Sequence, residues 1–71
     1  MSKRKIVIFK FVPEIGMYEE QVSLTVTQYK GLLEIEKNAK REIAKMQRVS
    51  EGKYGYIVMQ NGQSLTEFKY A

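Results

Sequence analysis

Residues 54–70, YGYIVMQNGQSLTEFKY, decide the fold, because two runs of strand-forming residues flank the Asn-Gly pair at 61–62. Asn-Gly favours a two-residue type I′ turn, since both central positions of that turn need a positive φ. A turn of this length places Val58 opposite Leu65 across the two strands. We therefore predict a tight β-hairpin whose strands are residues 53–60 and 64–70.

Side chains alternate between the two faces of this predicted hairpin. The first face carries Tyr54, Tyr56, Val58 and Leu65. The second face carries Ile57, Met59, Thr66 and Phe68, and we expect this face to pack under a helix. A sheet with one helix cannot cover both of its faces. We therefore expect the first face, together with Ile6 and Ile8, to stay open as an aromatic and aliphatic interface.

Two further strands are predicted before the helix. Residues 5–12, KIVIFKFV, are β-branched or aromatic with little polar alternation, which indicates a central strand covered on both faces. Turn-forming residues follow at 13–16, PEIG, and residues 18–24 then alternate polar and apolar side chains. These segments form another predicted hairpin.

One amphipathic helix is predicted between the two hairpins. Thr25 and Gln28 have the spacing of a capping box, and Ser-Glu-Gly at 50–52 ends the helical pattern near Arg48. One side of this helix carries the apolar residues that we expect to cover the sheet: Tyr29, Leu32, Leu33, Ala39, Ile43 and Met46. The order is ββαββ, an α+β fold with one helix on a mainly antiparallel four-stranded sheet. Residues 1–71 then form a single domain.

The residue types in the chain argue against catalysis. The 71 residues contain no Cys, His or Asp and carry a formal net charge of +4. The commonest general base, the thiolate nucleophile and the usual ligands of zinc are therefore missing. We expect a binding protein without enzymatic activity, metal or cofactor. No apolar run approaches the roughly 18 residues that cross a bilayer, so we expect a cytoplasmic protein with no membrane association.

Glu36 falls near the middle of the apolar side of the predicted helix, where a carboxylate is costly. We expect this residue to lie at the border of that side and to pair with Lys40, one helical turn further on. Two alternatives are a buried carboxylate bonded to a Tyr hydroxyl and an interface residue that meets a cationic partner.

The opposite side of the predicted helix is basic. Its cations are Lys30, Lys37, Arg41 and Arg48, which fall in a narrow sector of the helical wheel, with Lys45 nearby. Such a stripe can follow the phosphates of a nucleic acid. It is equally consistent with the solvated face that every amphipathic helix needs.

Residues 52–59, GKYGYIVM, resemble the RNP1 octet of the RNA-recognition motif, in which aromatic residues on a central strand stack bases. The match covers positions 54–57, whereas the first two positions stand in inverted order. That family also has two helices in a βαββαβ chain, and this sequence predicts one. The resemblance implies base stacking on Tyr54 and Tyr56.

Two functions from different classes follow from these features. The first is a small nucleic-acid-binding protein, for DNA or RNA, that neutralises phosphates with the basic helix side or stacks bases on Tyr54 and Tyr56. The second is a protein-interaction module, either a homodimer or an inhibitor or regulator of a larger protein. Its contact surface would be Tyr54, Tyr56, Val58 and Leu65. In that role it is similar in type to the small basic proteins that bacteriophages and mobile elements encode to redirect host machinery.

Overall fold

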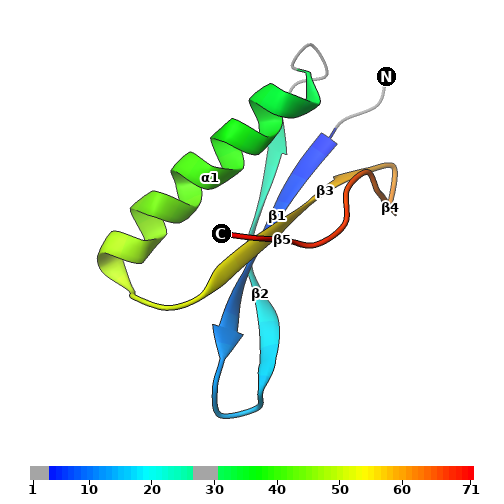
Figure 1. The fold of residues 1–71 in the computed structure, drawn as a ribbon. Helices are drawn as coiled ribbons and strands as arrows, with labels where there is room; N and C mark the ends of the chain where they lie inside the picture. The colour runs from blue at the N-terminus through cyan, green and yellow to red at the C-terminus, as the bar shows by residue number, and fades with distance from the viewer. Residues whose placement is uncertain (1–3, 27–30) are drawn as a thin grey trace.

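The computed structural model describes residues 4–26 and 31–71, and it has the predicted order of two strands, one helix and further strands. The elements are β1 (Arg4–Val12), β2 (Met17–Val26), α1 (Leu32–Val49), β3 (Tyr54–Gln60), β4 (Gln63–Ser64) and β5 (Lys69–Tyr70). In Figure 1, α1 lies across one side of the sheet, and the hairpin of β1 and β2 projects past the end of the helix. The α+β class and the single helix on a mainly antiparallel sheet are confirmed.

β1 is the central strand, as its apolar sequence predicts. The strand order is β2-β1-β3-β4, and β5 also pairs with β3. β1 is antiparallel to both of its neighbours, with Ile8 opposite Val22 on one side and opposite Tyr56 on the other. Directly opposite residues share a face of the sheet, so these three side chains point together toward α1.

The Asn-Gly turn is confirmed in detail. Asn61 has a φ of 53° and Gly62 a φ of 77°, the positive values that a type I′ turn needs. The backbone amide of Leu65 donates to the carbonyl of Val58 over 2.7 Å, so the predicted pairing of these two residues is correct.

The last predicted strand is broken into two short pieces. An uninterrupted hairpin would continue from the Val58–Leu65 pair to place Glu67 opposite Tyr56, but the structure places Lys69 there. Two extra residues therefore bulge out between β4 and β5. The predicted strand at 64–70 is correct only at its two ends.

The start of the helix differs from the sequence prediction. β2 runs to Val26, and Thr25 pairs with Lys5 in the sheet, so Thr25 cannot cap a helix. α1 instead begins after Gly31, which makes no side-chain cap. Gln28 and Tyr29 lie outside the described residues. Thr25 and Val26 are β-branched and extend a strand better than they start a helix, so sheet pairing overrides the local capping pattern. The predicted end is right, since Ser50 is the C-cap.

The core lies between α1 and the sheet. From α1 it contains Ile35, Ala39 and Ile43, and from the sheet Ile6, Ile8, Tyr54, Tyr56 and Val58. The predicted apolar side of the helix is right at Ala39 and Ile43. It is wrong at Leu33, which is 76% exposed, and it omits the fully buried Ile35.

The predicted choice of sheet face is also wrong. Tyr54, Tyr56 and Val58 do share one face with Ile6 and Ile8, but this is the face that α1 covers. Each of the three side chains is at most 2% exposed. Of the four residues expected to form an interface, Leu65 alone is exposed. Ile57 and Met59 lie on the opposite face, which we call the open face.

Candidate functional site

The outer side of α1 carries an exposed row of cations. We call Lys37, Arg41, Lys45 and Arg48 the basic stripe, and all four are exposed. They lie on the side of the helix opposite the buried Ile35, Ala39 and Ile43. The fifth cation of the sequence prediction, Lys30, lies outside the described residues. The outward direction that the sequence predicts for this surface is therefore correct for these four residues.

The cations of the basic stripe make few hydrogen bonds or ion pairs with the rest of the described protein. Lys45 Nζ lies 3.3 Å from Oε2 of Glu42, and Arg41 donates to Oδ1 of Asn38 over 3.4 Å. Within the described part of the chain, Lys37 and Arg48 make neither a hydrogen bond nor an ion pair. Exposed pairs such as Lys45 with Glu42 contribute at most about 1 kcal/mol, so they can be exchanged for other partners at little cost.

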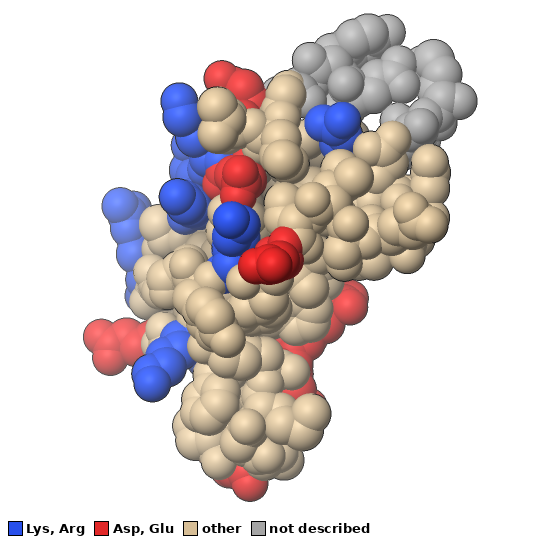
Figure 2. All heavy atoms as spheres, turned by 45° about the vertical axis from the view of Figure 1, so that its right-hand side comes forward, with Lys and Arg blue, Asp and Glu red and all other residues tan. Residues whose placement is uncertain are grey.

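The geometry of the stripe suits an extended row of anions. Lys37 and Arg48 are eleven residues apart, which is about 16 Å along a helix that rises about 1.5 Å per residue. Figure 2 shows Lys and Arg side chains, with some Glu side chains among them, along the side of the molecule that α1 occupies. The projecting end of the β1–β2 hairpin is tan and red in the same view. The cations and the acidic hairpin are therefore separated in space.

Tyr54 and Tyr56 are buried with their hydroxyl groups bonded. The hydroxyl of Tyr54 donates to the backbone carbonyl of Ser50 over 2.7 Å, and the hydroxyl of Tyr56 donates to Oε1 of Glu36 over 2.8 Å. Burial, and then the nearby Glu36 carboxylate, raise the pKa of Tyr56 to about 12. In this fold the two rings are covered by α1 and present no surface on which a base could stack.

The preferred interpretation of Glu36 is therefore right about its position at the border of the apolar side, since Glu36 is half-buried, and wrong about its partner. This carboxylate accepts a bond from a Tyr hydroxyl, and no Glu36–Lys40 ion pair occurs among the residues described. The signal was in the sequence, because a carboxylate on the apolar side of a helix needs a donor, and a Tyr hydroxyl is a donor that an apolar layer can contain.

The open face carries an aromatic cluster that the sequence reasoning did not assign. We use this name for Phe9, Phe11, Tyr18, Phe68 and Tyr70, whose ring centroids lie 4.9 to 5.9 Å apart in neighbouring pairs. Four of the five ring pairs pack edge to face, and the Phe9–Phe68 pair is tilted. Phe68 lies over Gly55, where a Cβ atom would come within 2.3 Å of the ring. Most of the cluster is half-buried by its own contacts, whereas Tyr70 is 74% exposed. Strand alternation was the available signal, since Phe9 and Phe11 point away from Ile6 and Ile8.

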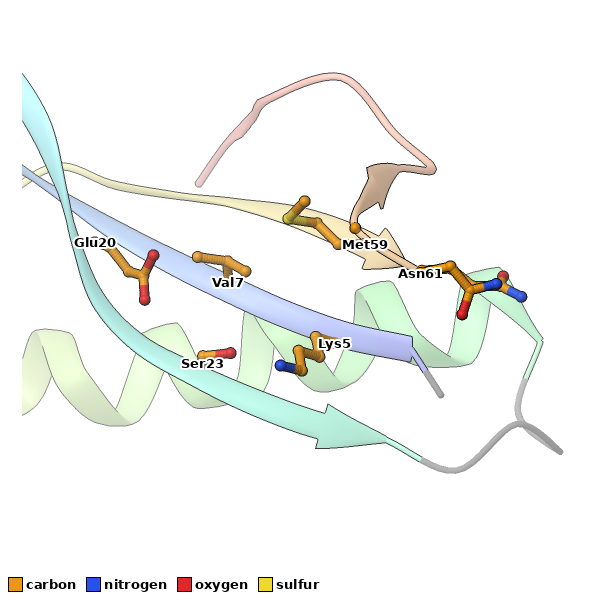
Figure 3. Close-up of a pocket in the computed structure, with 8 residues that line it drawn as sticks. Lys5, Val7, Glu20, Ser23, Met59 and Asn61 are labelled. Carbon is orange, nitrogen blue, oxygen red and sulfur yellow. The ribbon is translucent and has the colours of Figure 1, made fainter. Parts of the chain in front are cut away.

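A shallow hollow lies beside the aromatic cluster on the open face. It has a volume of about 570 Å³ and is lined by residues that include Lys5, Val7, Glu20, Ser23 and Met59. Figure 3 shows the side chains of Glu20, Val7 and Lys5 following one another along it. The hollow therefore has a carboxylate toward one end, an ammonium group toward the other and an apolar residue between them.

The tip of the β1–β2 hairpin is a third exposed feature. Ile15 and Met17 are both more than half exposed there. The turn is held by the amide of Gly16, which donates to the carbonyl of Val12 over 2.9 Å. This tip therefore presents two apolar side chains, beside the exposed Glu14, on a turn closed by backbone hydrogen bonds.

Among residues 4–26 and 31–71, no group of three His, Cys, Asp or Glu side chains is placed to hold a metal ion. Within the same ranges, no helix has the length and apolar character needed to cross a membrane. Comparison with models of known protein families, with curated proteins and with solved structures finds no match for this chain.

Proposed function

We propose that this protein binds nucleic acid through the outer side of α1, with the basic stripe contacting phosphates. The observation that carries the proposal is the row of four exposed cations on one side of a single rigid helix, two of which have no partner among the described residues. Phosphate contacts supply most of the affinity of non-specific nucleic-acid binding, and they need no shaped pocket. A cytoplasmic location is part of this proposal.

The distribution of acidic groups supports the same surface. Glu42 already pairs with Lys45, and the acidic residues of the β1–β2 hairpin, Glu14, Glu19 and Glu20, belong to the other layer of the fold. Glu34, in the first turn of α1, is an exposed carboxylate in the sector of the stripe. A phosphate chain along α1 would therefore meet attraction along the stripe without strong repulsion from the hairpin. We expect dissociation constants of about 1 to 100 µM at physiological salt, the range of sequence-independent binding.

The proposal is tested by comparing two triple variants that lose the same charge. The stripe variant carries Lys37→Gln, Arg41→Gln and Arg48→Gln, and the control carries Lys5→Gln, Lys53→Gln and Lys69→Gln on the sheet layer. Binding to labelled duplex DNA and single-stranded RNA is followed by fluorescence anisotropy. We expect the stripe variant to lose about tenfold or more in affinity and the control to lose about threefold or less. Equal losses would mean that net charge alone attracts the nucleic acid, and the stripe would not be the site.

A second candidate function is a protein-interaction module, and the observation that favours it is the exposed apolar hairpin tip. Exposed apolar side chains on an ordered turn are suited to entering a cleft of a larger protein. The test is a capture experiment from nuclease-treated lysate with the parent and with an Ile15→Ser, Met17→Ser variant. A specific protein that the parent retains and the variant loses would support this function. Equal retention of that protein by the parent and by the variant would contradict this function.

A further inference from the structure

The open face of the sheet lacks a second covering layer in the described structure. α1 covers the other face, and the aromatic cluster covers only the end of the open face near Phe9. The remaining part holds the hollow that Lys5, Val7 and Glu20 line. Sheets in stable domains are normally packed on both faces, or have one strongly polar face. This face is mixed, with Val7 buried and Ile57 and Met59 partly buried beside the charged groups.

The charges on the open face are arranged so that the face complements itself. Val7 on β1 lies between the two charged residues, Lys5 and Glu20. Lys5 is two residues before Val7 on the same strand. Glu20 lies on β2 opposite Phe9, which is two residues after Val7. The ammonium group and the carboxylate are thus displaced by about 7 Å in opposite directions along the strands, at a rise of about 3.3 Å per residue. No ion pair joins Lys5 to Glu20 within the described chain.

A two-fold axis parallel to the sheet and perpendicular to β1, above Val7, brings these charges together. The rotation carries Lys5 of a second copy over Glu20 of the first, and Glu20 of the second over Lys5 of the first. Lys5 of one copy and Glu20 of the other are then offset sideways by one strand spacing, about 4.8 Å, and these long side chains can span that distance. The strands of the two sheets would be aligned, the usual arrangement for two sheets packed about 10 Å apart.

We propose that the open face is the interface of a homodimer, in which Lys5 of each copy pairs with Glu20 of the other across a two-fold axis at Val7. The dimer is independent of the proposed nucleic-acid binding, because α1 lies on the opposite side of the sheet and its basic stripe stays exposed. Two stripes would face outward in opposite directions. A dimer could therefore bridge two segments of nucleic acid.

The size of the face sets the expected affinity. The three long strands cover a planar area of roughly 30 by 14 Å, or about 400 Å². Stable complexes bury about 800 Å² on each partner, so this interface belongs to the weak class. We expect a dimer that forms reversibly at about 10 to 500 µM protein and weakens as salt is raised.

Charge exchange tests the interface directly. Lys5→Glu and Glu20→Lys each turn two attractive contacts of the dimer into repulsive ones, and we expect each to weaken the dimer about tenfold or more. The double variant restores both attractions with the charges exchanged, so its dimer should return to within about threefold of the parent. Sedimentation equilibrium without nucleic acid measures all four proteins. Thermal unfolding confirms that each variant is folded, as expected for substitutions at exposed positions.

Two matched controls separate the interface from net charge. Lys37→Glu and Glu34→Lys make the same charge changes on the outer part of α1 and should leave the dimer unchanged. A parent protein that stays monomeric up to about 1 mM at low salt overturns the proposal. It is also overturned if the protein dimerises but the single variants have no effect, or if the double variant fails to restore the dimer. None of these outcomes bears on nucleic-acid binding, which the stripe variant tests separately.

Discussion

The hydroxyl of Tyr56 on β3 donates a hydrogen bond to Oε1 of Glu36 on α1 over 2.8 Å, so the two layers of the fold are joined by a polar contact at the edge of their apolar core. Tyr54 makes the equivalent contact two residues earlier, with the backbone carbonyl of Ser50 at the end of the helix. Both tyrosines can be buried because each hydroxyl has an acceptor. These two bonds help to determine which face of β3 lies under α1.

The Tyr56 bond should be measurable as stability. Replacing Tyr56 with Phe keeps the ring and removes the donor, and we expect the free energy of unfolding to fall by about 1 kcal/mol in urea denaturation. Tyr70→Phe is the control, since Tyr70 is mostly exposed and should change stability by less than about 0.5 kcal/mol. If the two variants were equally stable, the Tyr56 hydroxyl would not be engaged in the folded protein.

The raised pKa of Tyr56 gives a pH dependence with a defined sign. Burial and the Glu36 carboxylate raise this pKa from 10.0 to about 12, so the folded state holds the phenolic proton more tightly than the unfolded chain does. The resulting stabilisation is complete below pH 10 and is lost as the pH rises from 10 toward 12. The stability advantage of the parent over Tyr56→Phe should therefore shrink over that range. Parallel pH profiles for the two proteins would contradict the assignment.

The placement of α1 predicts unequal effects for two neighbouring apolar residues. Ile35 is fully buried against the sheet, and Ile35→Ala should cost about 2 to 5 kcal/mol. A domain of this size has only about 3 to 5 kcal/mol in total, so the variant should be largely unfolded by circular dichroism. Leu33→Ala should change stability by less than about 0.5 kcal/mol, because Leu33 is exposed. The reverse order would indicate a helix rotated about its axis.

Replacing Gly55 with any residue that has a side chain should destabilise the protein. A Cβ atom at this position would lie 2.3 Å from the Phe68 ring and 2.9 Å from the carbonyl of Lys69, so Gly55→Ala must displace β5 or the ring. We expect a loss of about 1 to 3 kcal/mol. Combining Gly55→Ala with Phe68→Leu should cost less than the sum of the two single changes, because they share one contact. Strict additivity would show that the ring does not pack on this glycine.

Local sequence signals were sufficient for the turns, the central position of β1 and the end of the helix. Asn61 and Gly62 require a conformation that few other residue pairs adopt, and the apolar sequence of β1 is typical of a central strand. The start of the helix could not be predicted in the same way. Thr25 fits both a cap and a strand, and the choice depends on its pairing with Lys5, twenty residues earlier in the chain.

Local sequence pattern also could not predict which face of β3 packs on the helix. Both faces of β3 are apolar, so alternation separates Tyr54, Tyr56 and Val58 from Ile57 and Met59 without showing which set is buried. The decision comes from β1, whose Ile6 and Ile8 pair with Val58 and Tyr56. The basic stripe was predictable because it depends only on the periodicity of one helix. The aromatic cluster was only partly predictable. Alternation places Phe9, Phe11 and Phe68 on the open face, but no local pattern shows the two-residue bulge that brings Tyr70 opposite Gly55.

The salt dependence of nucleic-acid binding tests the central proposal most directly. If the basic stripe neutralises phosphates, the logarithm of the binding constant on duplex DNA should fall with the logarithm of salt concentration by about 0.9 for each phosphate contacted. The variant with Lys37→Gln, Arg41→Gln and Arg48→Gln should then have a slope flatter by about two to three units, with its stability almost unchanged. Equal slopes for the parent and this variant would show that the outer side of α1 does not contact the nucleic acid.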